Sequence, residues 1–302
     1  MKKTKVSLVL GSGGARGYAH IGVIRELEAR GYEIVSISGA SMGALVGGFY
    51  ACGRLQAYTD WVLGLDALDV AALLDLSWSR RGLIDGEKLF AKLSRILGKC
   101  RIEELPIPYT AVATDLRRNR EVWFQRGPLI EAIRASIAIP SFFTPVEKNG
   151  MLLVDGGVLN PLPVAPTTSD HSDLTIAVHL YGENPLPEIE VLPLPESEKR
   201  SIDRMIDPLL EHARSWLERK EAKRTKEDED LHLFDIIDQA IDSMQKTLVG
   251  YRLGGYPPDL LIQIPKEVCD VYDFHKAAEV IAHGEHAARR ALDELKASHG
   301  LA

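Results

Sequence analysis

Apolar residues along the chain gather in short runs, and most of these runs are separated by longer stretches in which apolar residues recur with helical spacing. The runs typical of buried strands cover residues 6–10, 34–38, 109–114, 174–180 and 260–264. Strand-like runs that alternate with helix-like stretches are typical of a mainly parallel sheet covered by helices. The pattern therefore predicts an α/β fold.

Glycine, proline and aspartate mark several ends of the helix-like stretches. Residues 18–30 form a stretch that Gly31 closes, at the usual C-terminal position of glycine. Pro128 can open a helix that runs to about residue 138, because proline fits the first helical turn. A last helix is expected over about residues 274–295, with Asp273 as its cap.

Two further segments have the pattern of antiparallel strands. Residues 121–125 follow a polar turn, and residues 151–154 follow Asn149-Gly150, which is the strongest short hairpin signal. The second segment ends in Asp155-Gly156-Gly157. Because α/β enzymes tend to keep their ligands at the edge of the sheet, Asp155 is well placed for chemistry.

A change in composition precedes the last strand. Residues 182–200 are rich in proline and acidic residues, which predicts an extended linker. Helical spacing over residues 202–217 and 234–248 then predicts a helical hairpin whose apolar stripes form core or a homo-oligomer interface, with a lid or membrane-facing surface as the alternative. We expect one domain, 1–302, with a core of about 5–181 and 256–297 and a linker plus helical insert of about 182–252.

Composition narrows the possible partners. The chain has 302 residues, 45% of them hydrophobic, so it can bury a large core. Its net charge of −7 argues against a nucleic-acid partner, which needs a basic face.

The cysteines and the distribution of apolar residues indicate the cellular location of the protein. Cys52, Cys100 and Cys269 are an odd number without metal-ligand spacing, which predicts free thiols in a reducing compartment and no metal site. The apolar run at the N-terminus stops at Gly11, after about five residues, where a signal peptide needs about 7 to 15. No segment reaches the roughly 18 apolar residues of a membrane span. We expect a cytoplasmic protein, with any membrane contact peripheral.

Ser41 is the first candidate for chemistry. It stands in Gly39-Ala40-Ser41-Met42-Gly43, between the strand-like run 34–38 and a helix-like stretch. A strand, a sharp turn and a helix hold a serine hydroxyl away from the backbone, as in a nucleophile elbow. Side chains at the two glycines would clash in so strained a turn. Five residues are a weak pattern, so the remaining motifs must carry the interpretation.

The first strand ends in a glycine-rich loop that runs directly into a helix. The loop reads Gly11-Ser12-Gly13-Gly14-Ala15-Arg16-Gly17. Its N–H groups, with the positive end of the helix dipole behind them, can bind a phosphate or a transition-state oxyanion. The glycines do not fit the dinucleotide fingerprint in register, and the loop lacks the Gly-Lys-Ser/Thr ending of a P-loop. An oxyanion site is therefore favoured.

Four motifs in this order resemble the patatin-like phospholipase family, in particular its bacterial members similar to neuropathy target esterase. The resemblance spans about residues 5–181 and the final strand and helix. The motifs are the loop 11–17 continued by Tyr18-Ala19-His20-Ile21-Gly22-Val23, the elbow 39–43, residues 134–140 with Phe143-Thr144-Pro145-Val146, and Asp155-Gly156-Gly157 with Asn160-Pro161-Leu162-Pro163-Val164.

The resemblance implies a three-layer α/β/α fold and a Ser-Asp dyad that hydrolyses lipid acyl esters. Ser41 would attack the ester carbonyl, Asp155 would take its proton, and an acyl-enzyme would form and be released by water. No metal or organic cofactor is implied. The oxyanion donors would come from Gly13 and Gly14, with Arg16 next, and the motif glycines are Gly11, Gly17, Gly39, Gly43, Gly156 and Gly157.

Two positions depart from the commonest pattern of the family. Ser12 stands where many members have glycine, and Gly157 where many have alanine. Neither departure removes a catalytic group.

Two histidines are weighed for a catalytic role, and two other functions stay open as alternatives. His179 could complete a triad but is expected to be structural, and His20 is expected to pack or cap. The same acyl-enzyme would also support transfer to an alcohol or thiol. A regulatory protein that binds a partner through its insert, with minor esterase activity, is a further alternative.

Overall fold

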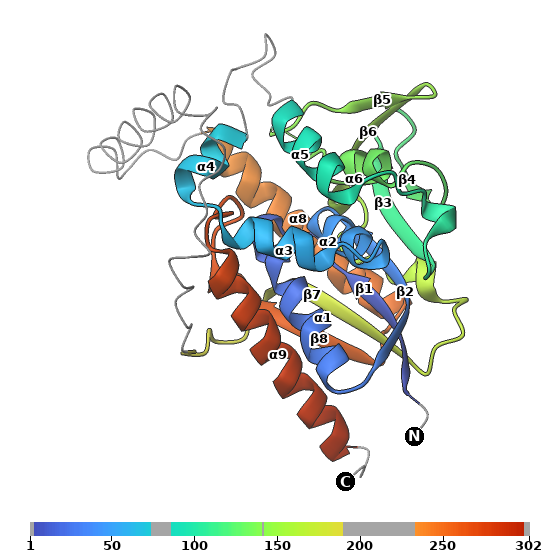
Figure 1. Cartoon of the computed structure of the whole chain (residues 1–302), viewed down its shortest axis with the longest axis vertical. Helices are drawn as coiled ribbons and strands as arrows, with labels where there is room; N and C mark the ends of the chain where they lie inside the picture. The colour runs from blue at the N-terminus through green and yellow to red at the C-terminus, as the bar shows by residue number, and fades with distance from the viewer. Residues whose placement is uncertain (1–2, 74–85, 141, 190–232, 299–302) are drawn as a thin grey trace, which may run out of the picture.

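An eight-stranded sheet forms the centre of the computed structural model, which describes residues 3–73, 86–140, 142–189 and 233–298 (Figure 1). The order of seven of its strands is β5-β6-β3-β2-β1-β7-β8. The eighth strand, β4, pairs with β3 and has no place in this linear order. The strands of the central part are parallel, while β4, β5 and β6 pair antiparallel. The strands are β1 (Lys5–Leu10), β2 (Glu33–Ala40), β3 (Tyr109–Asp115), β4 (Arg120–Phe124), β5 (Val146–Lys148), β6 (Met151–Asp155), β7 (Leu174–Gly182) and β8 (Leu260–Pro265).

Helices cover both faces of this sheet, as the alternating pattern predicts. The described helices are α1 (Ala19–Ala29), α2 (Met42–Ala51), α3 (Leu55–Leu63), α4 (Ala67–Leu73), α5 (Glu87–Leu97), α6 (Leu129–Ser136), α8 (Leu233–Gly255) and α9 (Ala277–Ser298). A short 3-10 helix (Gly14–Tyr18) joins β1 to α1.

Both faces of the sheet are apolar. Successive side chains of a strand point to opposite sides, and the central strands carry apolar residues at successive positions. On β1, Leu8 and Leu10 belong to the large core that includes α1, α2 and α9. Val9, between them, packs in a second cluster with Ala177 of β7 and Val249 of α8. The helix α8 therefore covers the face opposite α1 and α9, and contributes to the core of the domain.

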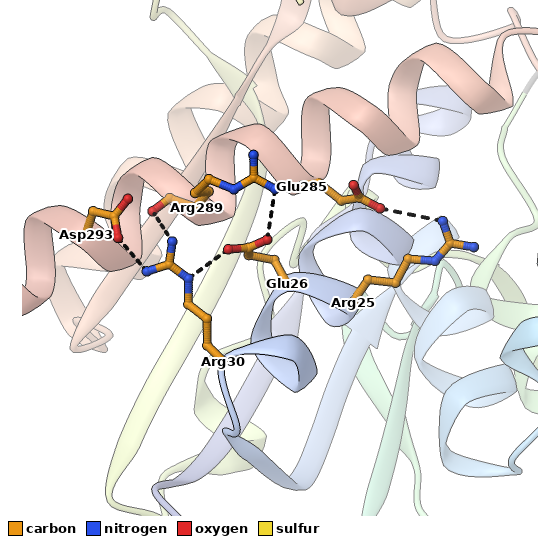
Figure 2. Close-up of polar contacts among 6 residues, drawn as sticks. All are labelled: Arg25, Glu26, Arg30, Glu285, Arg289 and Asp293. Carbon is orange, nitrogen blue, oxygen red and sulfur yellow. Dashed lines mark hydrogen bonds and ion pairs between the residues drawn. The ribbon is translucent and has the colours of Figure 1, made fainter. Parts of the chain in front are cut away.

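The first and last described helices pack side by side on one face (Figure 1). Glycine permits their close approach: a Cβ on Gly22 would lie 2.1 Å from the carbonyl oxygen of Ile281, and one on Gly284 would lie 2.1 Å from that of Ala19. Figure 2 shows the charged residues that flank this contact. They pair as Arg25 with Glu285, Glu26 with Arg30 and Arg289, and Arg30 with Asp293.

Some boundaries differ from the sequence expectations. The last helix begins at Ala277, so Asp273 does not cap it and instead pairs with Lys276 at 2.7 Å. The helix after Pro128 ends at Ser136. The first half of the expected helical hairpin and most of the linker lie outside the described residues, and α8 contains the second half.

One expectation about the cysteines is wrong. Cys52, after α2, and Cys100, after α5, form a disulfide with their Cα atoms 6.8 Å apart, and among the described residues only Cys269 is a free cysteine. Cysteine spacing does not encode such pairing, because the two residues come together only where α2 and α5 both pack against α3 and α6. The cysteines therefore no longer support a reducing compartment.

Candidate active site

Ser41 stands at the sharp turn between β2 and α2. Its backbone has φ 55° and ψ −127°, a left-handed conformation that side-chain-bearing residues rarely adopt. Close packing around the turn requires the flanking glycines. A Cβ on Gly43 would lie 2.0 Å from the carbonyl oxygen of Leu10, and one on Gly39 would lie 2.5 Å from the nitrogen of Ala44. The structure thus has the strained elbow that the sequence predicts.

Strand β3 aligns Ser41 with Asp155, although the two residues are far apart in the sequence. The last residue of β2, Ala40, pairs with Val112 of β3. The last residue of β6, Asp155, pairs with the next residue of β3, Ala113. Because β2 runs parallel to β3 and β6 runs antiparallel, the ends of β2 and β6 meet, and the elbow serine arrives beside the aspartate.

The end of α6 and the residues after it hydrogen-bond to the ends of β2 and β6, where Ser41 and Asp155 lie. The N–H of Ser41 donates to Oγ of Ser136 at 3.0 Å, and the Ser136 hydroxyl donates to the carbonyl oxygen of Val112 at 2.6 Å. The N–H of Asp155 donates to the carbonyl oxygen of Ala138 at 2.9 Å. The sequence motif does not predict this role of Ser136, since nothing in the sequence shows which groups a buried helical serine will bind.

The Asp155 carboxyl group is buried, with 2% of the residue exposed. Burial raises the pKa of Asp155 to about 7, against the lowering effects of hydrogen bonds from the Ser41 side chain and the Gly157 N–H. The Gly157 N–H donates to Oδ1 at 2.7 Å. Oδ2 has no partner of ordinary hydrogen-bond geometry among the described residues, so the Ser41 contact is looser than a full hydrogen bond. Such contacts commonly tighten when substrate binds.

The glycine-rich loop leaves two N–H groups free. The N–H groups of Gly11, Ser12 and Ala15 donate to carbonyl oxygens of neighbouring segments. Among the described residues, no acceptor binds the N–H of Gly13 or Gly14. Gly14 lines a cavity together with Ser41 and Asp155. A free N–H in that position is suited to an oxyanion.

The conformation of Gly14 explains why the loop needs glycine there. Its φ is +57°, and a Cβ would lie 2.4 Å from the carbonyl oxygen of Val271. The glycine-rich loop therefore packs against the segment after β8, which the short motif by itself does not predict.

Arg16 has structural partners. Its Nε donates to the carbonyl oxygens of Lys266 and Cys269, both at 3.0 Å, and its guanidinium lies over the ring of Tyr181. Arg16 lines neither of the two cavities that reach Ser41. It ties the loop to the segment after β8, so its predicted place beside the oxyanion stays a prediction.

The two histidines of interest line neither of the cavities that reach Ser41. His20 is fully buried and its Nε2 donates to the carbonyl oxygen of Gly11 at 2.9 Å. His179 on β7 is buried and lines neither cavity. Burial lowers the pKa of both imidazoles to about 4, so both are neutral at pH 7.

The remaining motif glycines lie where backbones or side chains crowd. A Cβ at each position would lie within 2.8 Å of an atom of another segment: Gly11 near Val178, Gly17 near Met42, Gly156 near Val112, and Gly157 near Ser12 and Gln245. The two departures from the commonest family pattern are thus neighbours in space, because Ser12 Oγ would lie 2.5 Å from a Cβ on Gly157. The serine hydroxyl takes the space that an alanine methyl group would need.

Two cavities meet at Ser41. The first is lined almost entirely by apolar surface. Its lining comes mainly from α2, α3, α4 and α5 and comprises Tyr18, Ser41, Met42, Leu45, Tyr58, Trp61, Leu65, Val70, Leu73, Leu89, Leu93, Ile137, Ile139, Phe143 and Phe274.

The second cavity has more polar walls. It brings Ser41 and Asp155 together with Gly14 and with residues of α8. Its lining comprises Ser12, Gly14, Ser41, Ile139, Pro140, Asp155, Val158, Tyr181, Ile241, Asp242, Gln245, Val271 and Tyr272. Ser41 therefore separates an apolar site from a polar one.

A match to a protein family decides how this site is classified. The family model described as patatin-like phospholipase matches residues 8–168, which include the loop, the elbow and Asp155. The chain belongs to the patatin-like phospholipase family. The mixed α/β fold with a mostly parallel sheet and surrounding helices is confirmed, and membership implies a lipid hydrolase.

Two relatives and one solved structure are similar to this chain. An uncharacterized NTE family protein of Mycobacterium tuberculosis is 43% identical over 332 residues, covering 97% of this chain and 92% of its own length. Mouse patatin-like phospholipase domain-containing protein 6 is 32% identical over 186 residues, covering 59% of this chain and 14% of its own. The crystal structure of VipD from Legionella pneumophila superposes with a TM-score of 0.47 at 14% identity, covering 97% of this chain and 67% of that one.

Two further features of the described residues concern the membrane and metals. None of the described helices combines the length and apolar character of a membrane-crossing segment. Within the same ranges, no group of histidine, cysteine, aspartate and glutamate residues could hold a metal ion.

Proposed function

We propose that the protein is a serine acylhydrolase for lipid acyl esters, with Ser41 as nucleophile and Asp155 as general base. The observation that carries the proposal is the position of Ser41 between two cavities. The apolar cavity suits an acyl chain, and the polar cavity suits the alcohol part of an ester. An ester carbonyl that spans the two would lie at the Ser41 hydroxyl.

In the first half of the reaction, Asp155 takes the hydroxyl proton as Ser41 Oγ attacks the ester carbonyl carbon. The free N–H groups of Gly13 and Gly14 would stabilise the negative charge that develops on the carbonyl oxygen. The bond from the carbonyl carbon to the alcohol oxygen then breaks, and that oxygen takes the proton from Asp155. The acyl group remains on Ser41, and water releases it.

The environment of Asp155 supports a base without histidine. An ordinary carboxylate is a poor match for a serine hydroxyl, because its pKa is about 3.9. Burial moves the pKa of Asp155 to about 7, close to the pH at which the enzyme would work. Oδ2, which lacks a partner of ordinary geometry among the described residues, is the oxygen available for the proton.

Labelling with a fluorophosphonate tests the nucleophile. We expect covalent labelling of Ser41 in the folded protein, because the probe needs an activated serine and an oxyanion site. Absence of labelling, with no hydrolysis of fatty-acid p-nitrophenyl esters, would overturn the proposal. A panel of phospholipids, lysophospholipids and acylglycerols, with Ser41→Ala beside the wild type, then identifies the lipid class.

A histidine variant tests the dyad. His179→Ala is expected to retain hydrolysis, since His179 lines neither cavity at Ser41. Loss of activity in a folded His179→Ala protein, as judged by its circular dichroism spectrum and melting temperature, would contradict a Ser-Asp dyad.

A further inference from the structure

Helix α8 supplies one wall of the polar cavity, although the match to the family ends at residue 168. Ile241, Asp242 and Gln245 line the cavity from successive turns of this helix. The side chains at positions i and i+4 lie on one face of a helix, which explains why Ile241 and Gln245 point the same way. Residues beyond the family motifs therefore reach the catalytic serine.

Gln245 is the member of this wall whose amide oxygen lacks a hydrogen-bond partner among the described residues. It is 7% exposed, and its Oε1 has no hydrogen-bond partner among the described residues. The other polar residue of the wall, Asp242, interacts with the hydroxyl of Tyr181. A buried acceptor without a partner destabilises the fold, so its presence here points to a ligand.

The amide group of Gln245 lies over the loop that carries the base. A Cβ on Gly157 would lie 2.6 Å from Gln245 Nε2, and the Gly157 N–H donates to Asp155 Oδ1 at 2.7 Å. The cavity thus contains two buried acceptors without partners of ordinary geometry among the described residues, Asp155 Oδ2 and Gln245 Oε1, and the nucleophile Ser41.

We propose that Gln245 is a catalytic residue that orients the water molecule in the hydrolysis of the acyl-enzyme. Its Oε1 accepts a hydrogen bond from one O–H of the water while Asp155 Oδ2 accepts the other. The inference rests on the proposed function and adds a role for α8.

Atoms and protons balance in this step. The water oxygen attacks the carbonyl carbon of the acyl group on Ser41, and the proton that faces Asp155 passes to Oδ2. The bond between the carbonyl carbon and Ser41 Oγ then breaks, and Oγ takes the proton from Asp155. The products are a free carboxylic acid and the original serine, with no oxidant or further reactant. Gln245 takes no proton.

The number of O–H groups explains why this role belongs to hydrolysis. Water has two, so after Asp155 takes one, the second needs an acceptor in a buried cavity. An alcohol has only one, which Asp155 uses, and the same holds for the alcohol that leaves when the acyl-enzyme forms. Gln245 is therefore expected to favour water over alcohol as acyl acceptor, and to leave formation of the acyl-enzyme unaffected.

Pre-steady-state kinetics with a fatty-acid p-nitrophenyl ester test this role in Gln245→Met, which keeps the length of the side chain and loses its acceptor. We expect kcat to fall about 10- to 100-fold, as for a misoriented reactant. KM should fall with it, so that kcat/KM stays within about twofold and a burst of about one p-nitrophenol per Ser41 appears. With ethanol present, the ratio of ethyl ester to free acid should rise about 10-fold or more.

Two matched variants complete the design. Lys246→Met, at the next and exposed position of α8, should show wild-type kinetics and product ratio. Gln245→Glu keeps an acceptor oxygen at the same distance along the side chain. It should restore preference for water relative to Gln245→Met.

Several results would overturn the inference. Equal losses in kcat and kcat/KM without a burst would mean that Gln245 only supports the structure. Unchanged kinetics and product ratio would exclude any contact with the attacking water. In both cases the wild type would still acylate Ser41, whereas a wild type that forms no acyl-enzyme would contradict the proposed function itself.

Discussion

Two serine–aspartate contacts lie along the same strand of this protein, and only one of them forms the candidate active site. Ser36 lies within β2, and its hydroxyl donates to Oδ2 of Asp170. Ser41 follows the last residue of β2 and lies beside Asp155. Both serines are buried. The residue types are therefore the same, and the surroundings differ.

The surroundings of Ser36 give its hydroxyl polar partners on the protein. Its Oγ is also 2.9 Å from Oγ of Ser7, and the Ser7 hydroxyl is 3.4 Å from Asp170 Oδ2. None of these residues lines the cavities at Ser41. This contact has polar partners on the protein, no entry for a substrate from those cavities, and no positive φ at the serine, so it is suited to stability.

The surroundings of Ser41 differ in each of these respects. Its backbone is strained, cavities open on both sides, and Asp155 Oδ2 lacks a partner of ordinary geometry among the described residues. Strain and an unsatisfied carboxyl group reduce stability. If Ser41 is the nucleophile, as proposed, comparison of the two sites attributes its reactivity to what the fold leaves unsatisfied around the serine, and not to contact with an aspartate.

The largest expected effect separates the two serines. Ser41→Ala should lower hydrolysis about 10⁴- to 10⁶-fold, as the loss of a catalytic serine does in other hydrolases. Ser36→Ala should retain wild-type kcat/KM and lower the melting temperature, because it removes a buried hydrogen bond. Fluorophosphonate labelling followed by peptide mapping should find the label on Ser41 and none on Ser36. A label on Ser36 would contradict the distinction.

The two aspartates should differ in the same way. Asp155→Asn is expected to lower kcat/KM about 10⁴-fold, since the amide cannot take the proton. Asp170→Asn should leave kcat/KM close to wild type and destabilise the fold, because it weakens the acceptor of the serine hydroxyls. Steady-state assays with thermal unfolding of each variant check both expectations.

The pH dependence of folding stability tests whether the carboxyl group of Asp155 has a raised pKa. Burial raises its pKa from 3.8 to about 7, so the folded chain binds more protons than the unfolded chain between these values. The stability that this group contributes is fully present below about pH 3.8 and is lost as the pH rises through about 7. Asp155→Asn should therefore raise the melting temperature relative to wild type more at pH 8 than at pH 5. An equal difference at both values would contradict the raised pKa.

Ser136→Ala tests how the junction of β2 and β6 positions the nucleophile. The variant removes the acceptor of the Ser41 N–H and the donor to Val112. We expect kcat to fall about 10- to 100-fold, as for small misplacements of a reacting group, with KM little changed. The labelling rate by fluorophosphonate should fall in parallel. A large loss of melting temperature with an unchanged labelling rate would assign Ser136 to stability alone.

The last prediction concerns the pH dependence of kcat/KM in the wild type, which no substitution enters. The base must be ionised, so kcat/KM should rise with pH, about tenfold per unit below pH 7, and level off above it. His20 and His179 do not account for such a profile, because burial lowers the pKa of each to about 4. A profile that levels off near pH 5 would mean that Asp155 is not the base or that its pKa is ordinary.

The short motifs are sufficient to predict the local backbone around the candidate nucleophile. Gly39 and Gly43 around Ser41 predict a strained elbow, and the structure has it, because local sterics decide such a turn. Alternation of strand-like and helix-like stretches likewise predicts the mixed sheet, since side-chain periodicity acts within one element. Helix ends and the pairing of cysteines are less predictable, as the late start of α9 and the Cys52–Cys100 disulfide show.

Only the tertiary structure decided how distant segments meet. The register of β3 brings the end of β2 beside Asp155, and α8 carries Gln245 into the polar cavity. Strand register and helix docking depend on how the whole core packs, and no short pattern encodes them. The sequence by itself therefore determined which residues can react, and the packing of β3 and α8 decided which of them lie together.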